Sequence, residues 1–237
     1  MTTTNTTGTA EHVLCKSKAH RGQEVGGNLL PREEMPVRNT GTTSTGHRVP
    51  VLGIAGGTAS GKSTLAKALA LRHPGAVALI HIDDFYVPER DPQRGIRTLS
   101  ATGAETLDWN HPGSIDEDAV AAAVDAAATS GQHRMVVVEG LFALALPKVA
   151  VHATWRVYVD TPDDIRLARK LLRKIEIQRK DPLISLRNYL LSGRERHAEH
   201  VAPSRHRADL VLDGTMPTAD LLTAVDHLVG QDLAPAL

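Results

Sequence analysis

A glycine-rich turn carries the clearest chemical signal in this sequence. Gly56, Gly61, Lys62 and Ser63 match the spacing G-x-x-x-x-G-K-[ST], between an apolar run and an apparent helix. Glycines let consecutive backbone N–H groups turn inward around a phosphate, and the helix start adds unpaired amides and a positive dipole end. Lys62 would reach the outer phosphates, and Ser63 would ligate Mg²⁺. We therefore predict that a nucleoside triphosphate binds to Gly56, Gly57, Thr58, Ala59, Ser60, Gly61, Lys62, Ser63 and Thr64.

Acidic residues end two other apolar runs. Asp83 and Asp84 follow "AVALIHI", and Glu139 follows "MVVV". Open α/β sheets bind ligands at the carboxyl ends of their strands. A carboxylate at such an end could take the proton of a hydroxyl that attacks the terminal phosphate, and Glu139 suits Mg²⁺ or its water shell. The same acids could instead cap the next element or end a strand.

A basic segment, "TPDDIRLARKLLRKIEIQRK", supplies positive charge. Four cations fall at i, i+3, i+4 and i+7 on one face of a helix that Thr161 is predicted to cap: Arg166, Arg169, Lys170 and Arg173. Mobile cations can neutralise the charge of a phosphoryl group in transfer and exclude water as they close. A solvated basic face and a nucleic-acid face are the alternatives, and the formal net charge of zero weakens the second.

An alternation of predicted strands and helices positions these groups. Apolar runs predict strands over 48–56, 76–83, 135–140, 154–160 and 208–214, and helical patterns cover 62–73, 115–129 and 217–230. This order indicates an α/β fold with a doubly wound, parallel five-stranded sheet, of the P-loop NTPase type with a helical lid over about 165–200. The domain is predicted over 48–230, with a disordered, Thr-rich tail over 1–47 and a C-terminal tail over 231–237.

Length and composition restrict the class of protein further. The 237 residues can bury one sizeable core, and the neutral net charge gives no general attraction to nucleic acid or membrane. The single cysteine, Cys15, is typical of a reducing compartment. No apolar run approaches the roughly 18–20 residues that span a bilayer. We expect a cytoplasmic protein that acts on a small molecule, without nucleic acid or membrane partners, and that could form a homo-oligomer.

Together, "GGTASGKST", "HIDDFY", "DWNHPGSID", "VVVEGLF", "VDTPDDIRLARKLLR" and "PSRHRADLVLDG" resemble the uridine kinase and phosphoribulokinase family of P-loop kinases. The resemblance keeps that family's order and covers nearly all of 50–214. It implies transfer of a phosphoryl group from ATP, with Mg²⁺, most closely to the 5′-hydroxyl of a uridine- or cytidine-like nucleoside. A nicotinamide riboside or pantothenate-type kinase is the alternative within the family. An ATP-dependent regulatory or binding protein without a small acceptor is the alternative outside it.

The resemblance also assigns roles to individual residues. It makes Asp83 the general base and places Lys62, Arg169 and Arg173 on the transferred group, with Ser63 and Glu139 as the metal ligands inferred above. Around the acceptor it places Tyr86, Trp109, Asn110, His111, Arg166 and Asn188.

Two features depart from the family pattern. Asn110 stands where the family usually has Asp; an amide can both donate to and accept from a diol, and Asp108 could substitute. Uridine kinases also read the pyrimidine with a β-hairpin before the "EG" strand, but here only "TSGQHR" joins the predicted helix to that strand. Because readout of a base by hydrogen bonds needs buried partners, a looser site or an acceptor other than uridine stays open.

Overall fold

A five-stranded parallel sheet forms the centre of the computed structural model, which describes residues 48–88, 91 and 93–230. The tails predicted over 1–47 and 231–237 lie outside the described residues. The strand order is β2-β5-β1-β6-β7, so the chain crosses to both sides of β1, as the predicted doubly wound sheet requires. The strands are β1 (Val51–Gly56), β2 (Val77–His81), β5 (Met135–Glu139), β6 (Trp155–Asp160) and β7 (Leu210–Asp213).

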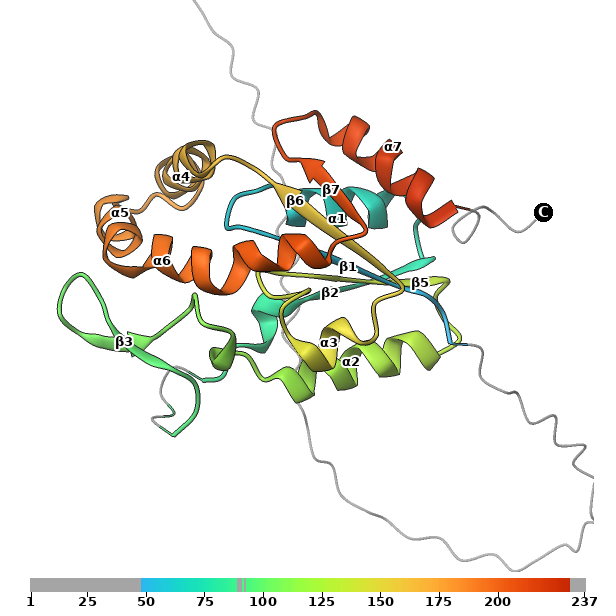
Figure 1. Cartoon of the computed structure of the whole chain (residues 1–237), viewed down its shortest axis with the longest axis horizontal. Coiled ribbons are helices and arrows are strands. Elements are labelled where there is room, and N and C mark those ends of the chain that lie inside the picture. Colours follow the sequence, from blue (N-terminus) through green and yellow to red (C-terminus); the bar gives the residue numbers. More distant parts are fainter. Residues whose placement is uncertain (1–47, 89–90, 92, 231–237) are drawn as a thin grey trace, which may run out of the picture. The chain divides into compact units, whose positions relative to one another are not determined.

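Helices cover both faces of this sheet. Figure 1 shows α1 and α7 on one side and α2 and α3 on the other. Every residue of β1 and β5 is buried, because strands covered on both faces contact apolar side chains above and below. The helices are α1 (Lys62–Arg72), α2 (Glu117–Thr129), α3 (Pro147–Ala150) and α7 (Thr218–Val229).

A second group of helices lies beyond one end of the sheet, where the lid is predicted (Figure 1). These are α4 (Asp163–Leu172), α5 (Leu183–Asn188) and α6 (Arg194–Arg196). Wider π-helical turns continue them at Arg173–Ile177, Tyr189–Gly193 and His197–Val201. None of the helices in the described part of the chain combines the length and apolarity that crossing a bilayer requires.

A short antiparallel hairpin, which the sequence patterns did not predict, precedes residues 109–112, here called the Trp109 motif. It consists of β3 (Arg97–Leu99) and β4 (Glu105–Leu107). Its loop closes through a hydrogen bond from the Ser100 amide to the Ala104 carbonyl, 2.8 Å long, and Gly103 takes a φ of 79° that favours glycine. Each strand has only three residues, which is too short for an apolar alternation to stand out.

Candidate active site

The glycine-rich turn lies between β1 and α1, and within it the Ser60 amide donates to the Gly57 carbonyl over 3.1 Å. Ala59 and Gly61 take the left-handed φ values of 62° and 105°, which turn the backbone into a loop. α1 begins at Lys62 without a side-chain cap, so its first N–H groups remain available to an anion. A cavity of about 320 Å³ opens over this turn. The geometry fits a bound phosphate chain.

A hydroxyl and a carboxylate meet beside this cavity. Ser63 Oγ donates to Glu139 Oε2 over 3.0 Å, and the Glu139 side chain is almost fully buried. The described residues contain no cluster of three or more His, Cys, Asp or Glu that could hold a metal alone. One hydroxyl and one carboxylate suit Mg²⁺, which usually keeps waters and phosphate oxygens as its other ligands. The two predicted ligands therefore fit the ion.

His81 is a residue of this site that the sequence did not predict. Its Nδ1 lies 2.7 Å from Glu139 Oε1, so the Glu139 carboxylate is held on one oxygen by His81 and on the other by Ser63. His81 and Glu139 are register partners at the ends of β2 and β5. The contact follows from the strand order, which sequence periodicity does not give.

Asp83 lies on the 3₁₀ helix Ile82–Phe85, directly after β2. Although its side chain is exposed, partial desolvation by the surrounding protein raises the pKa of Asp83, and the Lys62 charge opposes this rise. Lys62 itself is only 7% exposed. Burial lowers the pKa of Lys62, while Glu139 and Asp83 raise it. The Lys62 cation thus lies close to two carboxylates, those of Asp83 and Glu139.

A second cavity, here called the acceptor pocket, adjoins Asp83. It is lined by Thr58, Asp83, Tyr86, Trp109, Asn110, Leu141, Lys170, Lys174, Ser185 and Asn188. The rings of Tyr86 and Trp109 meet edge to face at 4.8 Å, and the Tyr86 hydroxyl donates to the Trp109 carbonyl over 2.6 Å. Asn188 Oδ1 accepts from the Ala101 amide over 2.7 Å, which ties the hairpin loop to α5. The pocket thus brings four of the residues predicted around the acceptor together beside Asp83, the predicted general base: Tyr86, Trp109, Asn110 and Asn188.

Two polar residues near the Trp109 motif do not line this pocket. His111 caps the short helix Pro112–Ser114 by accepting from the Gly113 amide over 2.9 Å. Asp108 is 1% exposed and accepts from Arg196 Nε over 2.9 Å and from the Asn110 amide over 3.0 Å. Because its carboxylate is buried and already bonded, Asp108 could bind a sugar diol in place of Asn110 only by giving up one of these bonds.

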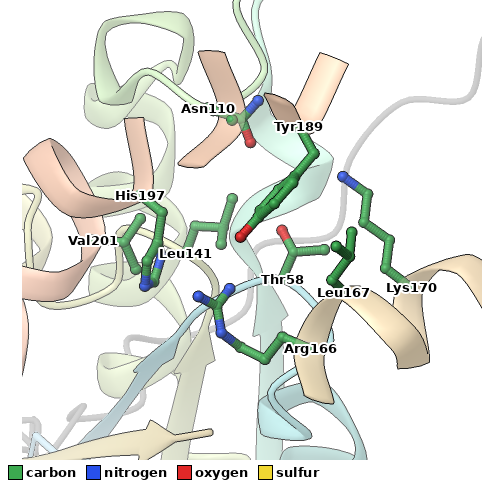
Figure 2. Close-up of a pocket in the computed structure, with 10 residues that line it drawn as sticks. Thr58, Asn110, Leu141, Arg166, Leu167, Lys170, Tyr189, His197 and Val201 are labelled. Atoms are coloured by element: carbon green, nitrogen blue, oxygen red, sulfur yellow. The ribbon is translucent and has the colours of Figure 1, made fainter. Parts of the chain in front are cut away.

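The predicted cationic face of α4 divides between different surroundings. Arg166 is 6% exposed, and its Nε donates to the Thr161 carbonyl over 3.1 Å. Its guanidinium lies against the turn, where a Cβ added to Gly57 would meet Nη1 at 2.4 Å. Figure 2 shows Arg166 and Lys170 diverging from α4. Arg166 therefore supports the turn and does not line the acceptor pocket.

Arg169 and Arg173, in contrast, line the cavity over the glycine-rich turn. Arg169 Nη1 also donates to the Gly214 carbonyl over 2.9 Å. Thr161, predicted as the cap of α4, instead donates its hydroxyl to the Ser60 carbonyl over 3.0 Å, and Pro162 takes the cap position. A buried threonine thus ties the end of β6 to the turn, a contact that only the sheet order reveals.

Comparison with known proteins agrees with this geometry. The family model "Phosphoribulokinase / Uridine kinase family" matches residues 114–221. A uridine kinase from Deinococcus deserti is 28% identical over 207 residues, which cover 76% of this chain and 97% of that protein. A uridine kinase from Chloroflexus aurantiacus is 27% identical over 188 residues, covering 69% of this chain and 86% of that protein.

The fold is shared with a solved kinase. The unliganded crystal structure of a sugar kinase from Janibacter sp. HTCC2649 matches with a TM-score of 0.51 at 18% identity, covering 79% of this chain and 96% of that one. The turn context, the order of the motifs and these matches together indicate a P-loop kinase fold and a phosphotransferase with an alcohol group as its acceptor, similar to members of the phosphoribulokinase and uridine kinase family.

Proposed function

We propose that the chain is an ATP- and Mg²⁺-dependent kinase that phosphorylates a primary hydroxyl of a small molecule. The observation that carries this proposal is the proximity of Lys62, in the glycine-rich turn, to the carboxylates of Asp83 and Glu139, whose charges raise the pKa of Lys62 against the effect of burial. A phosphate chain on the turn would thus lie close to a carboxylate that opens into the acceptor pocket.

Each residue then has one task. The amides from Gly57 to Lys62 bind the phosphate oxygens, and Ser63 and Glu139 hold the metal. Bound Mg²⁺ would withdraw charge from the outer phosphates. Asp83 accepts the proton of the acceptor hydroxyl, while Arg169 and Arg173 neutralise charge on the transferred group. Positioning and charge neutralisation supply nearly all of the rate enhancement in such a transfer.

Two classes of acceptor have support. The names of the uridine kinase relatives and the aromatic wall of Tyr86 and Trp109 favour the 5′-hydroxyl of a uridine- or cytidine-like nucleoside. A sugar, nicotinamide riboside or pantothenate-type acceptor is favoured by the short join between Thr129, where α2 ends, and Met135, where β5 begins. The connection between α2 and β5 is too short for a hairpin that would recognise a pyrimidine base.

A panel assay tests the proposal. Purified protein is mixed with ATP, Mg²⁺ and one alcohol at a time, namely uridine, cytidine, nicotinamide riboside, pantothenate or fructose, and ADP release is followed together with the mass of the product. We expect ADP release that requires one or more of these alcohols and that a Lys62→Met variant lacks. ATP hydrolysis that ignores every alcohol and rises only with a macromolecule would instead support a regulatory protein.

A further inference from the structure

Two lysines of the lid face the acceptor pocket. Lys170 lies near the end of α4, and Lys174 lies in the π-helical turn that follows. Both line the pocket together with Asp83 and Trp109. Since residues four apart share a helix face, the two ammonium groups belong to one surface of the lid.

The lid separates its lysines from its arginines. Arg169 and Arg173 are also four residues apart, but they line the cavity over the glycine-rich turn. Each lysine directly follows one of these arginines, and consecutive residues on a helix differ by about 100° around its axis. One side of the lid therefore presents arginines towards the phosphates, and the adjacent side presents lysines towards the acceptor.

Neither lysine has an anionic partner. Within the described ranges, neither the Lys170 nor the Lys174 side chain forms a hydrogen bond or an ion pair, although both side chains are half-buried. Burial lowers the pKa of Lys170, and the neighbouring charges that lower it further are all cations: Lys174, Arg173 and Arg166. A partly buried cation without a counter-charge is unfavourable, so this surface is suited to a ligand that brings negative charge.

Resting on the proposed function, we infer that the acceptor alcohol carries an anionic group, a carboxylate or a phosphate, which Lys170 and Lys174 bind while its hydroxyl faces Asp83. Two ammonium groups against one carboxylate leave the acceptor pocket with an excess of positive charge. A neutral nucleoside would leave both lysines unpaired. A nucleoside, sugar or hydroxy acid with an acidic substituent would use the aromatic wall and the lysines together.

The alternative is that these lysines contact the transferred phosphoryl group, together with the arginines. In that role they would stabilise the transition state for every acceptor, charged or neutral. The two roles therefore differ in whether the lysines discriminate between acceptors that share a hydroxyl and differ in an anion.

Matched pairs of alcohols measure this discrimination. The pairs are orotidine with uridine, pantothenate with panthenol, and ribulose 5-phosphate with ribulose; the first two test a carboxylate and the third a phosphate. kcat and KM are determined for the full chain and for Lys170→Gln, Lys174→Gln and Lys67→Gln. The last variant is the control, because Lys67 is exposed on α1.

We expect the wild-type protein to prefer the anionic member of at least one pair by tenfold or more in kcat/KM. Each lid variant should reduce that preference by roughly tenfold, as expected when a hydrogen bond to a charged group is lost. The loss should appear in the KM of the anionic acceptor, while the KM for ATP stays within about twofold and Lys67→Gln behaves as wild type.

Three results would overturn the inference: equal use of both members of every pair, lid variants that slow both members alike, or a preference that the lid variants leave intact. If no alcohol is phosphorylated, the proposed function fails separately. The inference is then decided by thermal shift with a non-hydrolysable ATP analogue. Stabilisation by the anionic members alone, lost in the lid variants, supports it; equal stabilisation by both members, or none, refutes it.

Discussion

Replacing Asp108 with Asn should destabilise the fold without removing an acceptor ligand. The Asp108 carboxylate is 1% exposed and accepts from Arg196 Nε over 2.9 Å and from the Asn110 amide over 3.0 Å. Asparagine keeps an oxygen for the amide but loses the charge that faces the guanidinium. Asp108 joins the Trp109 motif to α6, so its loss should loosen the contact between the acceptor pocket and the lid.

The size of this effect follows from the burial of the pair. A hydrogen bond to a charged group contributes about 1.5–3 kcal/mol. Arg196 remains 29% exposed and keeps Glu199 at 3.1 Å, so its guanidinium is not left unpaired. We therefore expect a loss in the lower half of that range, about 1.5–2 kcal/mol of unfolding free energy. For a domain of this size that corresponds to a Tm lower by about 3–8 °C.

Asp160→Asn is the matched control, because Arg205 Nε also meets Asp160 Oδ2 at 2.9 Å, but with the two side chains 47% and 48% exposed. An exposed pair contributes about 0–1 kcal/mol. Urea unfolding at constant m-value gives both losses, and steady-state kinetics give the KM of the acceptor. Equal losses of unfolding free energy in the two variants would refute the argument that burial makes the Asp108–Arg196 pair the stronger one. A stable Asp108→Asn protein with a strongly raised acceptor KM would restore the diol role for Asp108.

Two further changes test packing and charge. Gly140→Ala places a Cβ 2.6 Å from the Ile82 Cβ, so urea unfolding should show a loss of about 1–3 kcal/mol, and turnover should fall because Ile82 precedes Asp83. Gly193→Ala is the control: its Cβ would meet nothing closer than 3.5 Å, so it should leave stability unchanged. Equal losses of stability in Gly140→Ala and Gly193→Ala would contradict the steric argument. Burial lowers the pKa of His197 to about 4 from an ordinary value of 6.5. The unfolded chain then binds more protons between these values, so stability should fall as the pH drops from 6.5 to 4. Tm measured across this pH window should fall less steeply in His197→Asn than in the wild type. Parallel curves of Tm against pH for the two proteins would contradict the assignment of this pH dependence to His197.

The fold class and the place of the glycine-rich turn between a strand and a helix could be predicted because local patterns encode both. Strands covered on both faces read as continuous apolar runs, and the five main strands lie where those runs predict them. The turn of Gly56 to Ser63 depends on backbone conformations that glycine favours, so the motif and its flanks contain the information. The position of Asp83 after β2 follows in the same way.

The contacts between elements could not be predicted from these patterns. His81 meets Glu139 only because β2 and β5 are neighbours in the sheet, although the acids at both strand ends were visible. The β3–β4 hairpin was missed because its strands are three residues long. It contacts α5 through a hydrogen bond from the Ala101 amide to Asn188.

The lid illustrates why helical spacing alone is insufficient. Arg166 and Arg173 belong to one predicted face, yet Arg166 is buried beside Gly57 and Arg173 is exposed at the cavity over the glycine-rich turn. Spacing gives the angle of each side chain around the helix axis but not what packs against it. The lysine at position 170 gave the same signal as the arginines and lines a different pocket.

The most direct test of the account is the comparison of Asp83→Asn with Asp84→Asn. The two acids are adjacent and both exposed, but only Asp83 lines the acceptor pocket. Binding of a non-hydrolysable ATP analogue is measured by calorimetry, and turnover is measured with the alcohol that the panel identifies. We predict that both variants bind the analogue as wild type does, and that only Asp83→Asn loses turnover, by about 10²–10⁴-fold. Near-normal turnover by Asp83→Asn would contradict the account, because the hydroxyl proton would then pass to some other group.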